Sequence, residues 1–224
     1  GKLEGKGGKV LHGMRYAISE TTDHKPADIV AYSDADVTVK MEFVGRLIAS
    51  MVNEDGTLKP VAAVGSRNAD KGGLAVPFTV ADPEGYIGST ANWIRRTYFQ
   101  PENPIADTQM GLKAFTREAL EQILGYAKDT TFSFDTELQA LVLLTALVQM
   151  EEVGVLWFDS AEFTGTNVNE RLKMFKAWID QYRYLGRKGP ADQKAIVTEA
   201  DLEEFETLIE ETMQQKDSEK SPYF

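Results

Sequence analysis

The chain has 224 residues, of which 42% are hydrophobic, so it can form one large domain or a domain with an appendage. It contains no cysteine and only two histidines, which excludes a disulfide framework and a thiolate nucleophile and argues against a histidine-based zinc site. The net charge of −11 argues against general nucleic-acid binding, and no apolar stretch reaches the roughly 18–20 residues of a membrane span. We therefore expect a cytoplasmic protein.

The first fifteen residues are basic and rich in glycine, unlike the acidic remainder. They lead into an apolar pattern that fits one face of a helix, formed by Val10, Leu11, Met14, Ala17 and Ile18. Glycines and lysines at the start of a helix suit phosphate binding. A solvated basic turn is the alternative.

Residues 29–32 form an apolar run that predicts a buried strand of a parallel sheet. Asp34 and Asp36 follow it directly. Residues two apart in an extended segment point to the same side, so both carboxylates can face one hard cation. An acidic turn after a strand is the alternative.

The next segments predict a helix and a second strand. Phe43, Leu47, Ile48 and Met51 mark the helix, and residues 61–64 the buried strand. Arg67 comes just after this strand, where a guanidinium can bind phosphate or form a surface salt bridge. Residues 68–88 are polar and contain glycine, which predicts a mobile loop over the site.

Helices and short strands alternate along the rest of the chain. We expect a helix over residues 93–98 that is broken at 100–104, a short alternating segment at 113–115, and a helix over 117–127 capped by Thr116. Asp135 can cap a helix over 138–150, and Glu137 suits its first turn. A strand at 153–157 and helices over 168–185 and 201–215 complete an α/β sheet protein.

Several segments, in this order, resemble the signatures of family-2 glycosyltransferases, particularly the glucosyl type of polyprenyl-phosphate (dolichyl-phosphate) sugar synthases. They are residues 5–10, 32–36, 65–67, 107–115 and 134–138. The resemblance implies the nucleotide-sugar-transferase (GT-A) fold, a mostly parallel sheet in a three-layer α/β/α arrangement, over residues 1–165. A helical extension would follow over 166–224. The strand and helix with which the family begins are expected to be missing.

The resemblance also implies a role for each residue that matches a family motif. Asp36 would bind Mg²⁺ or Mn²⁺, and Asp34 the nucleotide ribose or the shell of the ion. Lys6 would lie near the donor and Arg67 would contact its phosphate. The acceptor and sugar side would be lined by Asp107, Thr108 and Gln109, with the acidic pair Asp135 and Glu137 in the same region.

The implied reaction moves a hexose from a UDP- or GDP-sugar to a lipid-phosphate acceptor with inversion. A hydroxyl acceptor would need a general base, for which Asp107 or Asp135 is the candidate, whereas an anionic phosphate would need none. The segment 164–167 lacks the cation usual in the family, which favours a soluble or polysaccharide hydroxyl acceptor. A non-catalytic sugar-nucleotide-binding or scaffold domain is the third hypothesis. Peripheral membrane binding and a homo-oligomer through the C-terminal helices remain open.

Overall fold

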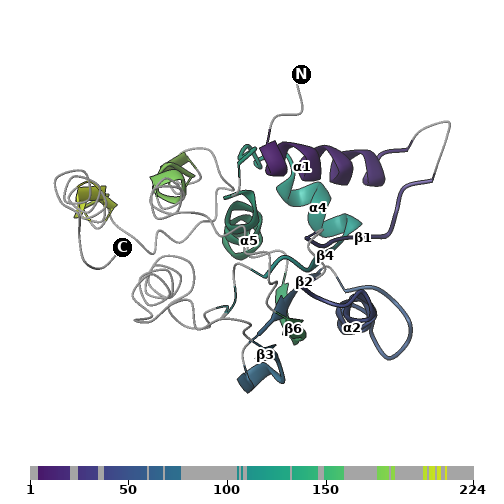
Figure 1. Cartoon of the computed structure of the whole chain (residues 1–224). Coiled ribbons are helices and arrows are strands. Elements are labelled where there is room, and N and C mark those ends of the chain that lie inside the picture. The colour runs from purple at the N-terminus through teal and green to yellow at the C-terminus, as the bar shows by residue number, and fades with distance from the viewer. Residues whose placement is uncertain are drawn as a thin grey trace.

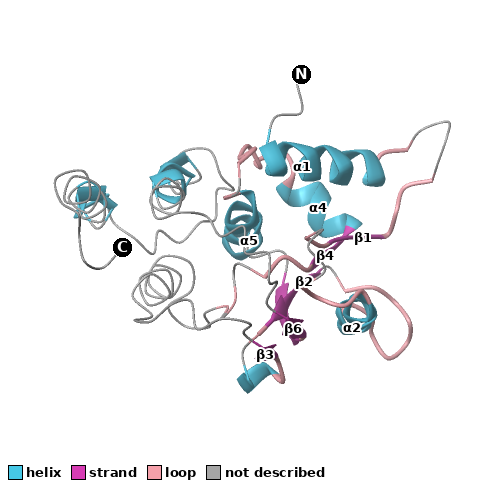
Figure 2. Cartoon of the chain, in the orientation of Figure 1, coloured by secondary structure: helices cyan, strands magenta, loops and turns pink. Residues whose placement is uncertain are grey.

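The computed structural model describes residues 5–20, 25–34, 38–59, 61–67, 69–76, 105, 107, 110–131, 133–145, 149–158, 176–181, 183–184, 199–200, 202–204, 206–207 and 210. Helices and strands alternate along these residues (Figures 1 and 2). The helices with defined bounds are α1 (Gly5–Ile18), α2 (Glu42–Ser50), α4 (Arg117–Ile123) and α5 (Phe134–Thr145), with a 3₁₀ turn η1 (Ala69–Lys71). The described residues of 176–184 and 199–210 are also helical, within the helices predicted over 168–185 and 201–215 or just before the second. The strands are β1 (Ile29–Tyr32), β2 (Val61–Ser66), β3 (Leu74–Val76), β4 (Lys113–Thr116), β5 (Gln149–Gly154) and β6 (Leu156–Phe158).

Four of the strands form a mixed sheet in the order β1-β4-β2-β5. Strand β4 runs antiparallel to both of its neighbours, and only β2 and β5 pair in parallel. Because β1 and β2 are both antiparallel to β4, they run in the same direction as each other. The strands β3 and β6 form a separate parallel pair. The fold is therefore α/β in class, but its four-stranded sheet is mixed and is not mostly parallel.

Helices cover both faces of the four-stranded sheet (Figure 1). On one face, α1, α4 and α5 pack over Ala62 and Phe115. On the other face, α2 packs over Ala63 and Ala114, the neighbours of those residues in the strands. The alternation follows from the period of two in a strand, which points successive side chains to opposite faces. The described core thus has three layers.

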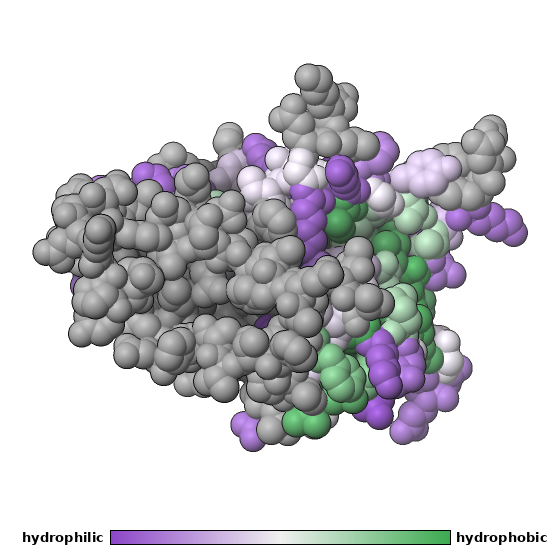
Figure 3. All heavy atoms as spheres, in the orientation of Figure 1, coloured by the Kyte–Doolittle hydropathy of each residue, from purple (hydrophilic) through white to green (hydrophobic). Residues whose placement is uncertain are grey.

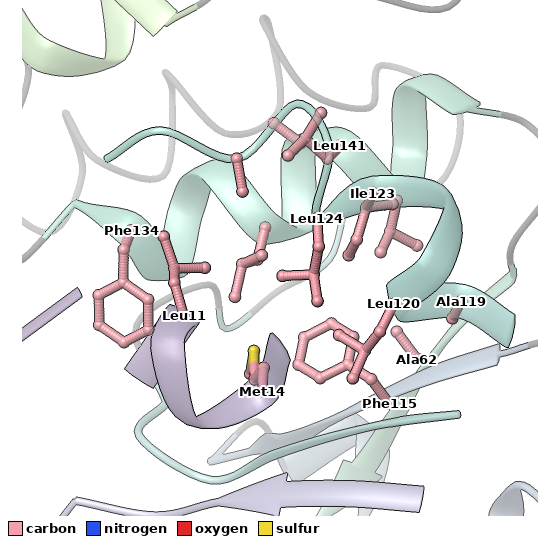
Figure 4. Close-up of a cluster of buried hydrophobic side chains, with 14 of the residues drawn as sticks. Leu11, Met14, Ala62, Phe115, Ala119, Leu120, Ile123, Leu124, Phe134 and Leu141 are labelled. Carbon is pink, nitrogen blue, oxygen red and sulfur yellow. The ribbon is translucent and has the colours of Figure 1, made fainter. Parts of the chain in front are cut away.

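The larger core cluster joins the three helices of the first face (Figure 4). In this view Leu11 of α1 lies beside Phe134 of α5, and Leu120 of α4 lies beside Phe115 of β4. Their exposed fractions are between 0% and 2%, so this cluster stabilises the fold by removing apolar area from water. Three residues from beyond position 165 belong to the same cluster, namely Trp178, Ile179 and Leu202.

The structure corrects the prediction for the first strand. Residues 29–32 do form a strand, but β1 pairs antiparallel with β4 and is an outer strand of the described sheet. None of its four residues is fully buried, and Ala31 is exposed. The apolar run resembled a central parallel strand because Val30 and Tyr32 pack on the side of α1 and Ile29 on the side of α2, while its partner strand lies far along the chain.

Several other elements also differ from the predictions. The loop after β2 contains η1 and β3, and α4 ends at Ile123 instead of residue 127. Helix α5 begins at Phe134, so Asp135 lies in its first turn and is not its N-cap, and Met150 belongs to β5. The alternating segment 153–157 is divided between β5 and β6, which belong to different sheets. The expected helix over 93–98 lies outside the described residues.

The described surface carries a few large apolar side chains among hydrophilic ones (Figure 3). Met41, Leu74 and Phe158 are 64%, 57% and 39% exposed. No helix among the described residues is both long and apolar enough to cross a membrane.

Candidate active site

The carboxyl ends of β1, β2 and β5 and the amino end of β4 meet at one edge of the sheet. Pairing places Tyr32 opposite Lys113, Lys113 opposite Val64, and Val64 opposite Glu152. Asp34 and Arg67 come shortly after this row, just beyond the ends of β1 and β2. Residues 110–112 also lead into β4 at this edge, with Asp107 shortly before them. The topology therefore brings together segments that are far apart in the sequence.

Arg67 and Asp107 form a two-pronged ion pair at this edge. Arg67 Nε donates to Asp107 Oδ2 at 2.6 Å and Nη2 donates to Oδ1 at 2.7 Å, while the Arg67 backbone N–H donates to Oδ2 at 3.1 Å. The guanidinium also lies 5.1 Å from the ring centroid of Trp157. Burial acts to raise the pKa of Asp107, but the hydrogen bonds and charge of Arg67, with a contribution from Lys113, lower it overall. Asp107 is therefore an ionised carboxylate that orients Arg67.

A second acid holds the backbone of Asp107. Glu152 of β5 accepts a hydrogen bond from the Asp107 N–H at 3.0 Å, and its side chain is only 2% exposed. Lys71 of η1 lies 3.9 Å from the other oxygen of Glu152. Asp107 is thus fixed from both sides, by Arg67 at its carboxylate and by Glu152 at its backbone.

Asp34 occupies a space that exists because residue 111 is glycine. The Asp34 N–H donates to the Gly111 carbonyl at 3.1 Å, and a Cβ on Gly111 would lie 2.3 Å from Asp34 Oδ2. The carboxylate pairs with Lys6 Nζ from the first turn of α1. About a third of the Asp34 side chain is exposed, so its oxygens remain within reach of a ligand. Lys6 and Asp34, both predicted to lie near the donor, are brought into contact.

Asp135 belongs to a buried network beneath this edge. Its Oδ1 accepts a hydrogen bond from Lys113 Nζ at 3.0 Å and another from the hydroxyl of Tyr32. Lys113 also donates to the Met110 carbonyl at 2.5 Å. Burial and the nearby carboxylates of Asp135 and Asp34 raise the pKa of Tyr32 well above its usual value. Tyr32 therefore stays protonated and remains a donor.

Glu137 lies elsewhere and supports a turn. Its carboxylate accepts backbone hydrogen bonds from Lys128 at 3.0 Å and Asp129 at 2.8 Å. Burial raises the pKa of Glu137, although these N–H groups oppose the shift. The turn that it holds packs against the start of α1. Of the expected acidic pair, only Asp135 contacts residues at this edge of the sheet, namely Lys113 and Tyr32.

The sequence suggested a phosphate site at the start of α1, but backbone carbonyls of the protein lie there. Gly8 N donates to the Thr130 carbonyl at 3.3 Å, and a Cβ on Gly7 would lie 2.7 Å from the carbonyl oxygens of Asp129 and Thr131. These oxygens carry partial negative charge and disfavour an anion. The glycines therefore serve close packing of α1, while Lys6 reaches the edge with its side chain.

The predicted residues Asp36, Thr108 and Gln109 lie outside the described residues. Among those that the structure describes, no group of three or more His, Asp or Glu side chains could hold a metal ion by itself. Mg²⁺ is commonly held by one or two carboxylates together with waters and substrate phosphates. The carboxylate of Asp34 fits a cation that also binds phosphate oxygens.

The sequence interpretation did not assign Lys113, Tyr32 or Glu152 to the site. Two signals were available in the sequence: Lys113 directly precedes the apolar pair Ala114 and Phe115, and Glu152 directly precedes the alternating run 153–157. A charged residue inside a strand must find a partner when it is buried. Comparisons of the chain with protein-family models and with curated proteins gave no match.

Proposed function

We propose that this chain is a metal-dependent, inverting glycosyltransferase with a GT-A fold whose sheet is mixed instead of mostly parallel. It would move a hexose from a nucleotide-diphospho-sugar to a polyprenyl-phosphate-type acceptor. The observation that carries the proposal is the pairing at one sheet edge of three acids with three cations: Asp34 with Lys6, Asp107 with Arg67, and Asp135 with Lys113. Charged groups gathered at converging strand ends are typical of a site that binds a charged substrate.

In the proposed reaction an acceptor oxygen attacks the anomeric carbon as the bond to the nucleoside diphosphate breaks. The electron pair of the broken bond stays on the leaving phosphate oxygen, where negative charge develops. Lys6 and Arg67 lie where they could compensate this charge, because each is about a third exposed and anchored by an aspartate. A bound Mg²⁺ or Mn²⁺ near Asp34 and Asp36 would supply further compensation on the diphosphate.

The ion pairs favour an acceptor that is already ionised. A hydroxyl acceptor needs a carboxylate that can take up its proton. Asp107 is a weak base because its pKa is lowered, and Oδ1 of Asp135 already accepts hydrogen bonds from Lys113 and Tyr32. A phosphate monoester attacks without losing a proton. This reasoning favours the lipid-phosphate acceptor over the soluble or polysaccharide hydroxyl acceptor.

A transfer assay separates these acceptors. The chain is incubated with Mn²⁺, radiolabelled UDP- and GDP-hexoses, and either a polyprenyl phosphate or the polyprenol of the same length. We expect label in the polyprenyl phosphate and none in the polyprenol. Transfer to the polyprenol, or to a soluble oligosaccharide, would instead support the hydroxyl acceptor.

Two aspartates near opposite ends of β1 provide matched variants for this assay. Asp34→Asn should abolish transfer, whereas Asp28→Asn should retain it, because Asp28 precedes the strand and pairs with Arg117 on the surface. Absence of transfer to every acceptor by the folded wild-type chain would contradict the enzymatic proposal and favour the scaffold hypothesis.

A further inference from the structure

Lys113 is the most completely buried charged group at the sheet edge, with 1% of its surface exposed. A lysine ammonium has three donors and loses its water when it is buried, so protein acceptors must replace that water. Here they are the carbonyl of Met110 at 2.5 Å and the carboxylate of Asp135 at 3.0 Å. The ammonium also lies 5.8 Å from the ring centroid of Tyr32. Lys113 therefore ties the start of β4 to both the preceding turn and α5.

The turn that Lys113 holds is also the one that receives Asp34. Its Gly111 carbonyl accepts the Asp34 N–H at 3.1 Å, and the missing Cβ of Gly111 leaves the space that the Asp34 carboxylate fills. The next carbonyl, that of Leu112, accepts the Gly65 N–H at 2.9 Å. A displacement of the Met110 carbonyl would move Gly111 and, with it, Asp34.

From this chain of contacts we infer that Lys113 is a positioning residue. Its bond to the Met110 carbonyl fixes the turn at Gly111 and so sets the place of the Asp34 carboxylate. The effect of this placement on ligand binding rests on the proposed function, whereas the placement itself does not. In the alternative role Lys113 only neutralises the charge of Asp135. That role predicts that removing both charges together leaves Asp34 in place.

Three variants separate the two roles. Lys113→Met with Asp135→Asn removes both charges and leaves no unpaired ion, while Asp135→Asn alone keeps the bond from Lys113 to Met110. The matched control is Lys59→Met with Glu151→Gln. Lys59 also binds a carbonyl, that of Ser50 at 2.9 Å, and a carboxylate, that of Glu151 at 3.3 Å, but it precedes β2 at the opposite end of the strand.

The readout is amide hydrogen exchange of Asp34, measured by NMR with Phe115 as the internal reference. We expect exchange at Asp34 to accelerate by about tenfold or more in the Lys113 and Asp135 double variant, because local opening governs exchange. Exchange at Phe115 should stay within about twofold. Asp135→Asn alone and the Lys59 control should keep Asp34 protected. Unchanged protection of Asp34 in the double variant would overturn the positioning role.

A measurement on the wild-type protein covers the case in which the double variant does not fold. Lys113 Nζ should show a hydrogen-bond scalar coupling to the carbonyl carbon of Met110. A Lys113 ammonium that lacks this coupling and exchanges as fast as an exposed lysine would contradict the inference.

A binding experiment completes the test, with UDP and GDP as the ligands in the presence of Mn²⁺. Calorimetric titration should show about tenfold weaker binding to the double variant than to Asp135→Asn, because a misplaced group at a binding site loses affinity. Equal affinities would overturn the effect on the ligand. Absence of binding to the wild type would count against the proposed function, while the exchange experiment would still decide the role of Lys113.

Discussion

Replacing Gly111 with alanine tests the geometry around Asp34 most sharply. The added Cβ would lie 2.3 Å from Asp34 Oδ2 and 2.4 Å from its Cγ, whereas ordinary contact begins at 3.4 Å. The carboxylate must therefore move by roughly 1 Å, the difference between these distances. The backbone of Gly111 does not need a positive φ, so the expected effect is steric.

Overpacking of this kind costs about 1–3 kcal/mol of unfolding free energy. For a chain of this size, about 2 kcal/mol lowers the melting temperature by about 4–8 °C. Thermal unfolding followed by circular dichroism measures the shift. We also expect Mn²⁺-dependent nucleotide binding to weaken as much as in Asp34→Ala, because the carboxylate is displaced.

The control for this substitution is Gly125→Ala, since a Cβ at Gly125 would meet nothing within 4 Å. A double-mutant cycle with Asp34→Ala isolates the clash, because two of the three close atoms belong to the Asp34 carboxylate. Gly111→Ala with the melting temperature and nucleotide affinity of the wild type would refute the reasoning.

Three further substitutions probe other parts of the structure. Gly7→Ala should lower the melting temperature because its Cβ would lie 2.7 Å from Phe134 Cβ, while Gly13→Ala in the same helix should raise stability by about 0.5–1 kcal/mol; a stabilising Gly7→Ala together with a destabilising Gly13→Ala would contradict the packing of α1. Arg67→Gln should raise the pKa of Asp107, measured by carboxyl ¹³C NMR titration. Because the pKa of Asp107 is lowered in the folded protein, the stability lost in Arg67→Gln should be largest where an unfolded aspartate is ionised and should shrink as the pH falls; an unchanged pKa would refute the pairing. Thr116→Ala should cost about 1 kcal/mol in chemical denaturation and Thr116→Ser much less, since the side chain accepts the Ala119 N–H; equal losses would argue against a capping role.

Local patterns in the sequence predicted the elements that form α1, α2 and β2. Of the apolar pattern that predicted α1, Leu11 and Met14 are buried and the other members are partly buried. The four apolar residues starting at Val61 are all buried in β2. Thr116 caps α4 as expected. These features depend on neighbouring residues alone, so the sequence carries them directly.

Pairing between distant strands could not be predicted in the same way. Strand β4 lies between β1 and β2, although 80 residues separate Lys113 from Tyr32 at the end of β1, and this insertion makes the sheet mixed. The four-residue run of β1 reads as a central strand because an apolar pattern reports how the faces of a strand are covered and not whether it has one neighbouring strand or two.

The candidate site likewise contains residues that the sequence predicted and contacts that it did not. The residues after the strands, Asp34 and Arg67, were predicted from their positions, and the structure brings Arg67 to Asp107 and Asp34 to Lys6. The partner of Asp135 was not predicted, because Lys113 reaches it from a different element of the fold. Ion pairs of this kind depend on tertiary placement, which residue type and spacing do not specify.

The most direct test of the proposed function is a calorimetric titration of UDP- and GDP-sugars with and without Mn²⁺. The wild-type chain, Asp34→Asn, Asp36→Ala and the surface control Asp28→Asn are compared. We predict metal-dependent binding of one nucleotide class to the wild type and to Asp28→Asn, and loss of that binding in Asp34→Asn and Asp36→Ala. Binding that is equal in all four proteins, or absent from the wild type, would contradict a donor site at this edge of the sheet.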